Sequence, residues 1–269
     1  MSGRIRAALI VCVLAVPATG VLAAVRHDVP RSAGRLILDD EFSGSSLDTA
    51  HWRTCYWWAT TGCTNAGNQE LEWYVPGQVQ VGGGIVRLIA ARRLTRGGNG
   101  HVYPFASGMI SSGPSEQGPP RFAFRYGRVE ARILVPSGPG LWSAFWMLPA
   151  DRQDLPEIDA METVGGTPDS VSMHVHYRGA GGKEIDMGSS WRYPSTAGGW
   201  HEFGIDWTPD RLEWLIDGKV RFHVTGAAVP HTAMYLLANL AVGGVVAGPP
   251  TASTSFPSAL GIDWIRVWQ

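Results

Sequence analysis

The stretch Glu157-Ile158-Asp159-Ala160-Met161-Glu162 places three carboxylates within six residues, with apolar residues between them. On a helix, Glu157 and Asp159 would point apart, because positions i and i+2 do not share a face. On a regular strand these two share a face, but Glu162 would point to the opposite side. One extra residue, a β-bulge near Ala160-Met161, returns Glu162 to the side of the other two acids. The spacing therefore predicts a bulged strand with three acids on a solvated face and apolar residues in a core.

This arrangement also indicates a chemistry. With the bulge absorbed, Glu157 and Glu162 behave like positions i and i+4 of a strand, roughly 13 Å apart at Cα. Side chains that lean toward each other would bring the carboxyl groups to about 5–6 Å, the separation of the acid pair in a retaining glycosidase. Taken alone, the hexapeptide also fits an exposed acidic strand or a surface cation site, because short acidic motifs are common.

The first residues have the pattern of a secretory signal peptide. Arg4 and Arg6 precede an apolar run over residues 7–16, and small residues follow up to Ala23 and Ala24. We predict a signal peptide over residues 1–24, a short N-terminal segment over 25–35 and a single domain over 36–269. The alternative is an uncleaved membrane anchor, since the apolar run is almost long enough to span a bilayer. We expect a secreted protein with no stable membrane insertion after cleavage.

Charge and cysteine usage restrict the classes of partner. The net charge of −1 gives no indication of binding to nucleic acid or to an anionic membrane. Cys55 and Cys63 lie eight residues apart in a chain with an export signal, and we predict that they form a disulfide. Two free thiols are the alternative. A metal site built from these two cysteines alone would be incomplete.

Short strand-like segments recur after the signal peptide, with turn signals between them. No amphipathic helix of about twelve residues, internal repeat or shift in composition interrupts them. Many short antiparallel strands predict an all-β fold, a sandwich or β-jelly roll of two curved antiparallel sheets whose concave face forms a substrate cleft. The predicted strands cover residues 36–38, 79–81, 85–90, 127–135, 171–177, 203–207, 212–216, 219–224, 234–241 and 261–268.

Several motifs then resemble glycoside hydrolase family 16, in the bulged form found in its laminarinases. The resemblance covers roughly residues 36–269, and it implies a β-jelly roll whose concave sheet binds a β-glucan, cleaved internally with retention. Besides the hexapeptide, the motifs in family order are Asp40-Glu41-Phe42, Asn68-Gln69-Glu70, residues 126–132, residues 140–149, residues 206–209, Asp217-Gly218, residues 239–244 and residues 263–269.

The resemblance also implies roles for individual residues. Glu157 would be the nucleophile, Glu162 the acid/base, and Asp159 an assisting group hydrogen-bonded to the nucleophile. Trp142 and Trp146 would be flat platforms for sugar rings. His176 is expected near the acid/base, with His174 on the same strand face. The remaining expected substrate-binding residues are Asn68, Glu70 and Tyr74, in a loop beside the cleft, and Asn239 in the groove.

Many members of this family hold a structural calcium ion on the convex face, and calcium requires oxygen ligands. By position, the ligands here would be Glu41, the carbonyl of Gly84, and Asp263. The resemblance implies no cofactor for catalysis. Two features depart from the laminarinases: residues 153–156 lack a common Trp-Pro, and Met109 stands where an arginine is often present. Both positions are expected to line substrate subsites, so they bear on the substrate rather than the mechanism.

The expected function is a secreted endo-β-1,3-glucanase that acts as a monomer on a polysaccharide. The same mechanism would serve mixed-linkage β-1,3-1,4-glucan, galactan or bacterial exopolysaccharide, or a transglycosylation in which only the acceptor differs. The non-enzymatic alternative is a lectin-like module that binds β-glucan. Such modules typically lose one catalytic glutamate, and here both Glu157 and Glu162 are present.

Overall fold

The computed structural model describes residues 34–269 apart from 59–61 and 193–197. The predicted signal peptide, residues 1–24, and residues 25–33 of the predicted N-terminal segment lie outside the described residues. Within the described part of the chain, no helix is long and apolar enough to cross a membrane.

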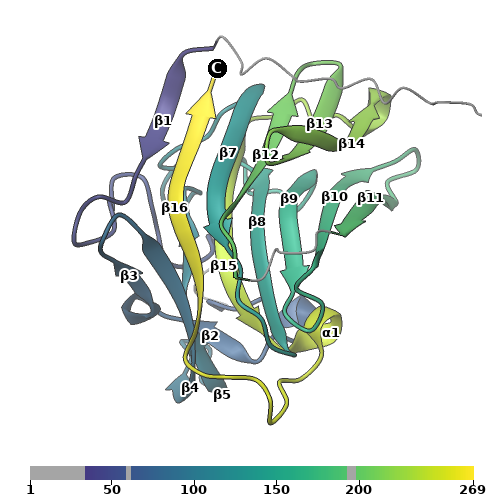
Figure 1. The fold of residues 1–269 in the computed structure, drawn as a ribbon. Coiled ribbons are helices and arrows are strands. Elements are labelled where there is room, and N and C mark those ends of the chain that lie inside the picture. The colour runs from purple at the N-terminus through teal and green to yellow at the C-terminus, as the bar shows by residue number, and fades with distance from the viewer. Residues whose placement is uncertain (1–33, 59–61, 193–197) are drawn as a thin grey trace, which may run out of the picture.

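Two sheets pack face to face, as predicted for a β-jelly roll (Figure 1). The larger sheet contains β1 (Leu36–Asp40), β2 (Glu72–Tyr74), β3 (Val79–Val81), β4 (Val86–Arg96), β5 (Val102–Ser107), β7 (Gly127–Leu134), β12 (His201–Trp207), β13 (Arg211–Ile216), β14 (Lys219–Thr225) and β16 (Ser258–Trp268). Its strand order is β14-β13-β12-β7-β16-β4-β5-β2, with β1 paired to β16 and β3 paired to β4.

The smaller sheet carries the acidic hexapeptide. It contains β6 (Met109–Ser111), β8 (Leu141–Pro149), β9 (Glu157–Val164), β10 (Ser170–Arg178), β11 (Glu184–Arg192) and β15 (Met234–Val242). Its order is β11-β10-β9-β8-β15-β6, and these neighbours are antiparallel. In the larger sheet β2 pairs with β5 in parallel, an exception to the antiparallel prediction.

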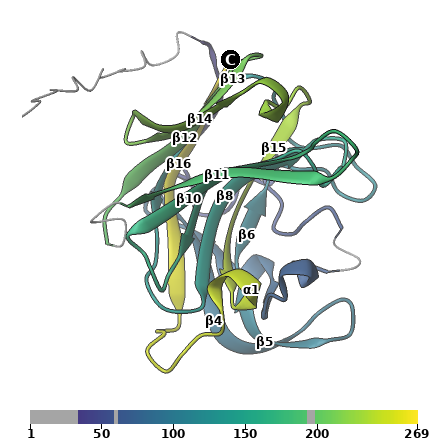
Figure 2. The same cartoon turned by 90° about the vertical axis from the view of Figure 1, so that its right-hand side faces the viewer.

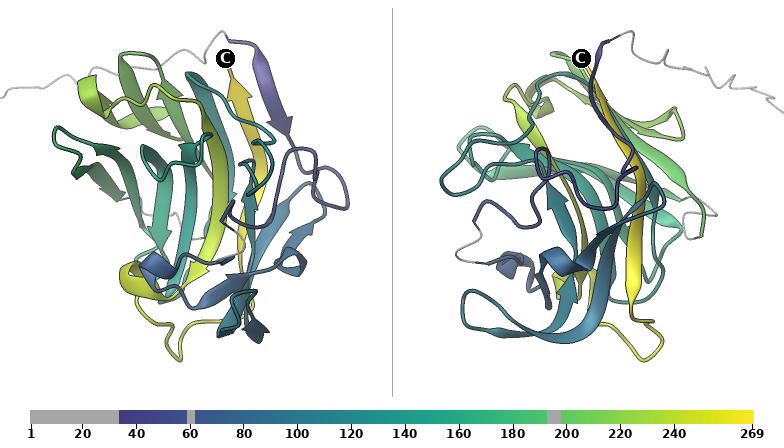
Figure 3. Two further views of the ribbon diagram at one scale, coloured as in Figure 1. Left: turned by 180° about the vertical axis from the view of Figure 1, so that it is seen from behind. Right: turned by 90° about the vertical axis from the view of Figure 1, so that its left-hand side faces the viewer.

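Helical segments are short. They are η1 (Ala66–Asn68), η2 (Pro76–Gln78), η3 (Gly226–Ala228) and α1 (Gly244–Ala247). Figure 2 and Figure 3 show the same two layers from the side and from behind, and α1 lies beside η1 and the start of β8. The described chain therefore has no helical layer, in agreement with the lack of a long amphipathic pattern.

The alternation that predicted the strands directs one face of each sheet into a shared core. In β7, Val129, Ala131 and Ile133 are buried between the sheets. The predicted hairpin turn at Asp217-Gly218 joins β13 to β14, and both residues have positive φ, 51° and 70°. Two successive residues with positive φ form the turn that suits the right-handed twist of a hairpin. The local sequence therefore determines this connection.

Candidate active site

The bulge in β9 lies where the sequence predicted it. Asp159 is opposite His174 of β10 and Glu162 is opposite Ser172, so β9 advances three residues while β10 advances two. The pairing with β8 shows the same extra residue between Asp159 and Met161. The prediction of one additional residue at Ala160-Met161 is therefore confirmed.

This bulge sorts the hexapeptide into two faces. Ile158, Ala160 and Met161 are buried in the core between the sheets. Glu157, Asp159 and Glu162 instead line a cleft of about 710 Å³ on the outer face of the smaller sheet. Complete burial of an apolar side chain the size of isoleucine or methionine contributes roughly 1.5–3 kcal/mol, and a buried unpaired carboxylate is strongly unfavourable. Both effects oppose a one-residue slip, which would exchange the two faces.

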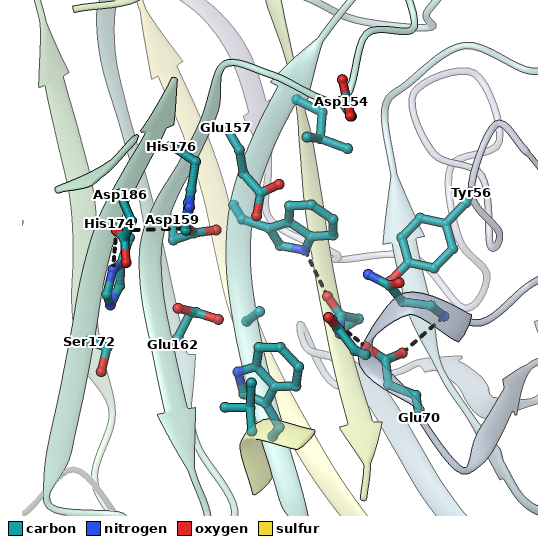
Figure 4. A pocket seen from close by; sticks show the side chains of 18 of the residues that line it. Tyr56, Glu70, Asp154, Glu157, Asp159, Glu162, Ser172, His174, His176 and Asp186 are labelled. Carbon is teal, nitrogen blue, oxygen red and sulfur yellow. Dashed lines mark hydrogen bonds and ion pairs between the residues drawn. The ribbon is translucent and has the colours of Figure 1, made fainter. Parts of the chain in front are cut away.

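Neighbouring strands supply the rest of the cleft (Figure 4). Trp142 and Trp146 project from β8, His174 and His176 from β10, and Asn239 from β15. Asn68 and Glu70 reach the cleft from η1 and the residues after it. Seven of the eight residues expected to bind substrate thus line one cavity with the three acids.

The eighth residue, Tyr74, lies behind the cleft wall and connects several of the others. It is 1% exposed. Asn239 Nδ2 donates a hydrogen bond of 3.0 Å to the Tyr74 hydroxyl, and Asn239 Oδ1 accepts one of 2.7 Å from Trp146 Nε1. The Tyr74 hydroxyl in turn donates to Glu70 at 3.5 Å. Tyr74 therefore orients the side chains that face the cleft, and the chain of bonds fixes the edge of Trp146.

The two histidines differ in their surroundings. His176 lies opposite Glu157 in the strand register, and its Nε2 is 3.4 Å from Asp159 Oδ2. His174 Nδ1 is 2.8 Å from Asp186 Oδ1 on β11. His176 was expected near Glu162. The register places it opposite Glu157 and beside Asp159, and its charge also acts on Glu162, where it opposes the rise in the pKa.

Burial is the main cause that raises the pKa of Glu157, Asp159 and Glu162 above the ordinary value of each carboxyl group. The charge of Asp159 adds to the rise in the pKa of Glu157, and the charge of Glu162 adds to that of Asp159. His174 and then His176 oppose the rise in the pKa of Glu162. Neighbouring buried carboxylates disfavour one another's charged forms. The three groups therefore hold a proton more readily than isolated carboxylates would.

Comparison with known proteins agrees with this geometry. A family model described as glycosyl hydrolases family 16 matches residues 93–266. The beta-glucanase of Rhodothermus marinus is 32% identical over 260 residues, which cover 87% of this chain and 85% of that protein. The chain belongs to glycoside hydrolase family 16. The solved endo-beta-1,3-glucanase of Pyrococcus furiosus is 31% identical, with a TM-score of 0.77 over 88% of this chain and 94% of the other.

A further relative in this comparison is the endo-1,3-1,4-beta-glycanase EglC of Rhizobium meliloti, 33% identical over 255 residues. The match covers 89% of this chain and 52% of that protein. The chain spans about half the length, or less, of the first curated relatives that it matches, with shares of 52%, 39% and 54%.

The sequence did not indicate how far the disulfide loop reaches into the cleft of this family 16 chain. Cys55 and Cys63 form the predicted disulfide. Tyr56 and Trp58 stack with ring centroids 4.3 Å apart and planes inclined by 8°, and both line the cleft together with Trp57. The two tryptophans were visible between the cysteines, but only the folded loop shows that they lie beside the acids.

The two departures from the laminarinase pattern lie in different parts of the structure, one in the cleft and one beneath it. Asp154, in the segment that lacks Trp-Pro, lines the cleft and pairs with Arg178 at 3.0 Å. Met109 was expected to line a subsite, and this expectation is wrong. Its side chain is fully buried beneath the cleft floor, in a cluster that includes Tyr74 and Trp146. Met109 therefore supports the floor and presents nothing to a ligand.

The two carboxylates expected to hold calcium on the convex face, Glu41 and Asp263, are already paired. Glu41 Oε1 accepts hydrogen bonds from Arg266 at 2.5 and 2.9 Å, and Asp263 accepts one from Arg132. Guanidinium groups compete with a cation for the same carboxylate oxygens. These side chains do not form an open cage of oxygen ligands, so calcium at this face stays a prediction from the family resemblance.

Proposed function

We propose that this chain is a secreted, retaining endo-β-glucanase that hydrolyses internal β-1,3 bonds of a glucan. The observation that carries the proposal is the placement of Glu157 and Glu162 on one face of β9, on either side of the bulge and within one cleft. Indole platforms stand on the same cleft wall, and flat aromatic surfaces suit the apolar faces of sugar rings. A similar solved structure is named an endo-beta-1,3-glucanase.

The proposed reaction has two displacements. In the first, Glu157 attacks the anomeric carbon, and the bond to the leaving sugar breaks as Glu162 donates its proton to the departing oxygen. In the second, Glu162 takes a proton from water, whose oxygen attacks the same carbon and releases Glu157. The products are two sugar chains, the configuration at the anomeric carbon is retained, and both glutamates return to their starting protonation. No cofactor enters this scheme.

Asp159 would help to keep Glu157 ionised and Glu162 protonated at the start of the reaction. It is fully buried, and burial raises its pKa well above the ordinary value for an aspartate. A neutral Asp159 can donate a hydrogen bond to Glu157 and stabilise the carboxylate needed for attack. His176 Nε2 lies 3.4 Å from Asp159 Oδ2, and Glu157, Asp159 and His176 bring their polar atoms within 4.8 Å of one another.

A second glucan is a candidate substrate for the same reaction. One relative is named an endo-1,3-1,4-beta-glycanase, which supports mixed-linkage glucan as the second candidate substrate. Hydrolysis of laminarin, lichenan, galactan and bacterial exopolysaccharide, followed by sizing of the products, separates these candidates. Fastest release of oligosaccharides from laminarin is expected. Longer products with added acceptor would indicate transglycosylation instead.

The catalytic proposal is tested by Glu157→Gln and Glu162→Gln. Each change is expected to lower kcat on the best substrate by at least about 10³-fold, because each removes a group that forms or breaks a bond in the transition state. Glu202→Gln, on β12 outside the cleft, is the control for loss of a carboxylate and should retain activity. Azide should partly rescue a Glu157→Ala variant and give a glycosyl azide of inverted configuration. Full activity in either glutamine variant would refute the assignment, and glucan binding by wild-type protein without cleavage would favour the lectin-like alternative.

We also propose that residues 1–24 direct export and that residues 36–269 form one catalytic domain that acts as a monomer. Charge and hydrophobicity at the start of the sequence support export, as does a disulfide, which persists in oxidising compartments. N-terminal sequencing of protein recovered from the medium tests cleavage near Ala24, and sedimentation tests the oligomeric state.

A further inference from the structure

A second group of side chains lies on the cleft wall beside the acids. His174, His176 and Asp186 each offer one nitrogen or oxygen atom, and these atoms all lie within 4.8 Å of one another. Residues i and i+2 of a strand share a face, so both imidazoles of β10 project into the cleft. Asp186 lies directly opposite His176 on β11. Two adjacent strands thus bring two imidazoles and a carboxylate to one point.

We propose that His174, His176 and Asp186 form a site for a zinc ion, which inhibits the enzyme reversibly when it binds. Two imidazoles and a carboxylate are a donor set that suits zinc better than calcium or magnesium. Ligand atoms about 2.1 Å from a tetrahedral zinc lie roughly 3.4 Å from each other. Asp186 Oδ1 is 2.8 Å from His174 Nδ1 and 3.9 Å from His176 Nε2, so the observed separations lie on either side of that value.

Surrounding residues hold the imidazoles in position for a cation. Glu184 Oε1 lies 3.1 Å from His176 Nδ1, so His176 can donate to Glu184 while the lone pair of Nε2 faces Asp186. A carboxylate on the far nitrogen is the usual partner of a histidine that binds zinc. Gly188 of β11 leaves space for the ring of His174. A Cβ atom at this position would lie 2.2 Å from His174 Nδ1 and would displace the ring. The ring of His174 therefore lies over the backbone of Gly188 and reaches Asp186.

The site is reachable from solvent, since the side chains of His174, His176 and Asp186 are 25%, 23% and 50% exposed. One of its residues, His176, also contacts the acids of the proposed reaction. His176 Nε2, the atom that would bind zinc, is the atom that lies 3.4 Å from Asp159 Oδ2. A bound cation would withdraw His176 from Asp159 and place a positive charge in the part of the cleft that a sugar occupies. Zinc and glucan are therefore expected to compete.

Binding is tested first without substrate. Full-length, untagged protein is treated with chelator and titrated with zinc chloride in a calorimeter, and cobalt chloride is added separately to read the visible absorption of a tetrahedral site. One zinc per chain is expected. His174→Asn and Asp186→Asn should each weaken zinc binding by at least about tenfold, and Gly188→Ala should weaken it with all three ligands still present. His51→Asn is the matched control, because His51 also pairs with a carboxylate, Asp48 at 2.6 Å, but has no second imidazole.

Inhibition is tested second, and this half of the proposal rests on the proposed function. Zinc should raise KM for laminarin, and chelator should restore it. Each variant is compared with its own metal-free rate, and His174→Asn should need at least about tenfold more zinc for the same inhibition. No saturable zinc binding, or equal affinity in wild type and His174→Asn, would overturn the site. Binding without inhibition would overturn the regulatory role alone, and failure to hydrolyse any glucan would count against the proposed function while the calorimetry still decides the site.

Discussion

The indole Nε1 of Trp214 donates a hydrogen bond of 2.7 Å to the backbone carbonyl of Asp159. Trp214 belongs to β13 of the larger sheet and is completely buried, so this bond crosses the core and reaches the acidic strand from behind. A β-bulge disrupts the ladder of backbone bonds around it. A buried carbonyl without a donor costs roughly 1–3 kcal/mol. The indole therefore stabilises the strand where three acids face the cleft.

Replacing Trp214 with phenylalanine should lower catalysis as well as stability. The change keeps an aromatic ring in the core but removes the donor to Asp159. We expect a loss of roughly 1–3 kcal/mol in the free energy of unfolding, and a fall in kcat of about 10- to 100-fold because the acids shift relative to the sugar. Urea unfolding and initial rates on laminarin measure the two effects.

Trp207→Phe is the control for this prediction. Trp207 is also buried in the core, and its Nε1 donates to the carbonyl of Pro230 at 3.1 Å, away from the acids. This variant should lose a similar amount of stability with kcat close to wild type. Equal kcat in both variants would show that the bond to Asp159 has no part in placing the acids.

The fold and the acidic face could be predicted from sequence because both depend on local periodicity. Alternation along β7 and β10 identified the strands, and the phase of three acids located the bulge. Pairing of Cys55 with Cys63 was predictable for the same reason, since the two cysteines are close in the chain.

Features that depend on the register between strands could not be predicted. His176 lies beside Asp159 because β10 pairs with β9 in a register that places His176 opposite Glu157. Asp186 enters the cleft only because β11 pairs with β10. Tyr74 looked like a groove residue, but its hydroxyl bonds to Asn239 from behind the wall. In each case the deciding contact joins two segments, and the alternation within one segment does not determine how it aligns with another.

Trp58→Ala should reduce the affinity for long glucans more than for short ones. Trp58 stacks on Tyr56 at the edge of the cleft, held in a loop closed by the Cys55–Cys63 disulfide. Loss of one aromatic platform should raise KM for laminarin by roughly tenfold, equivalent to about 1.4 kcal/mol, with little change in kcat. A series of laminari-oligosaccharides should show the difference growing with chain length.

Trp191→Ala serves as the control for surface tryptophan loss. Trp191 is 37% exposed on β11 and packs under the guanidinium of Arg221, outside the cleft. Its removal should leave KM unchanged for every chain length. If Trp58→Ala raised KM equally for short and long oligosaccharides, the loop would not contribute a separate binding surface.

Asn239→Ala should weaken substrate binding by releasing two neighbours at once. Asn239 accepts from Trp146 and donates to Tyr74, so the change leaves an indole N–H and a buried hydroxyl without their partner. We expect a loss of roughly 2–3 kcal/mol in the free energy of unfolding and a several-fold rise in KM. Ser112→Ala also removes two hydrogen bonds to backbone but lies outside the cleft, so it should lose stability without a change in KM.

Glu70, which lines the cleft, forms a buried carboxyl pair with Glu72. Burial is the main cause that raises the pKa of both groups, and the charge of Glu70 raises the pKa of Glu72 further. At low pH both the folded and the unfolded chain hold these protons, so the free energy of unfolding does not change with pH there. As pH rises, the unfolded chain loses its protons first, near the ordinary value for glutamate. The free energy of unfolding must therefore fall with rising pH until the folded groups ionise as well.

Glu72→Gln should remove part of this pH dependence. Glutamine keeps an oxygen able to accept the bond of 2.7 Å from the Val242 amide, but it carries no charge at any pH. We expect the variant to exceed wild type in the free energy of unfolding at pH 8 by about 1–2 kcal/mol, with the difference vanishing near pH 4. Glu213→Gln, which loses a carboxylate paired with Arg211 at 3.1 Å, should show no such gain at pH 8. Urea unfolding at several pH values measures this difference. A Glu72→Gln variant less stable than wild type at pH 8 would show that Glu72 is charged in the folded protein and is stabilised by its surroundings.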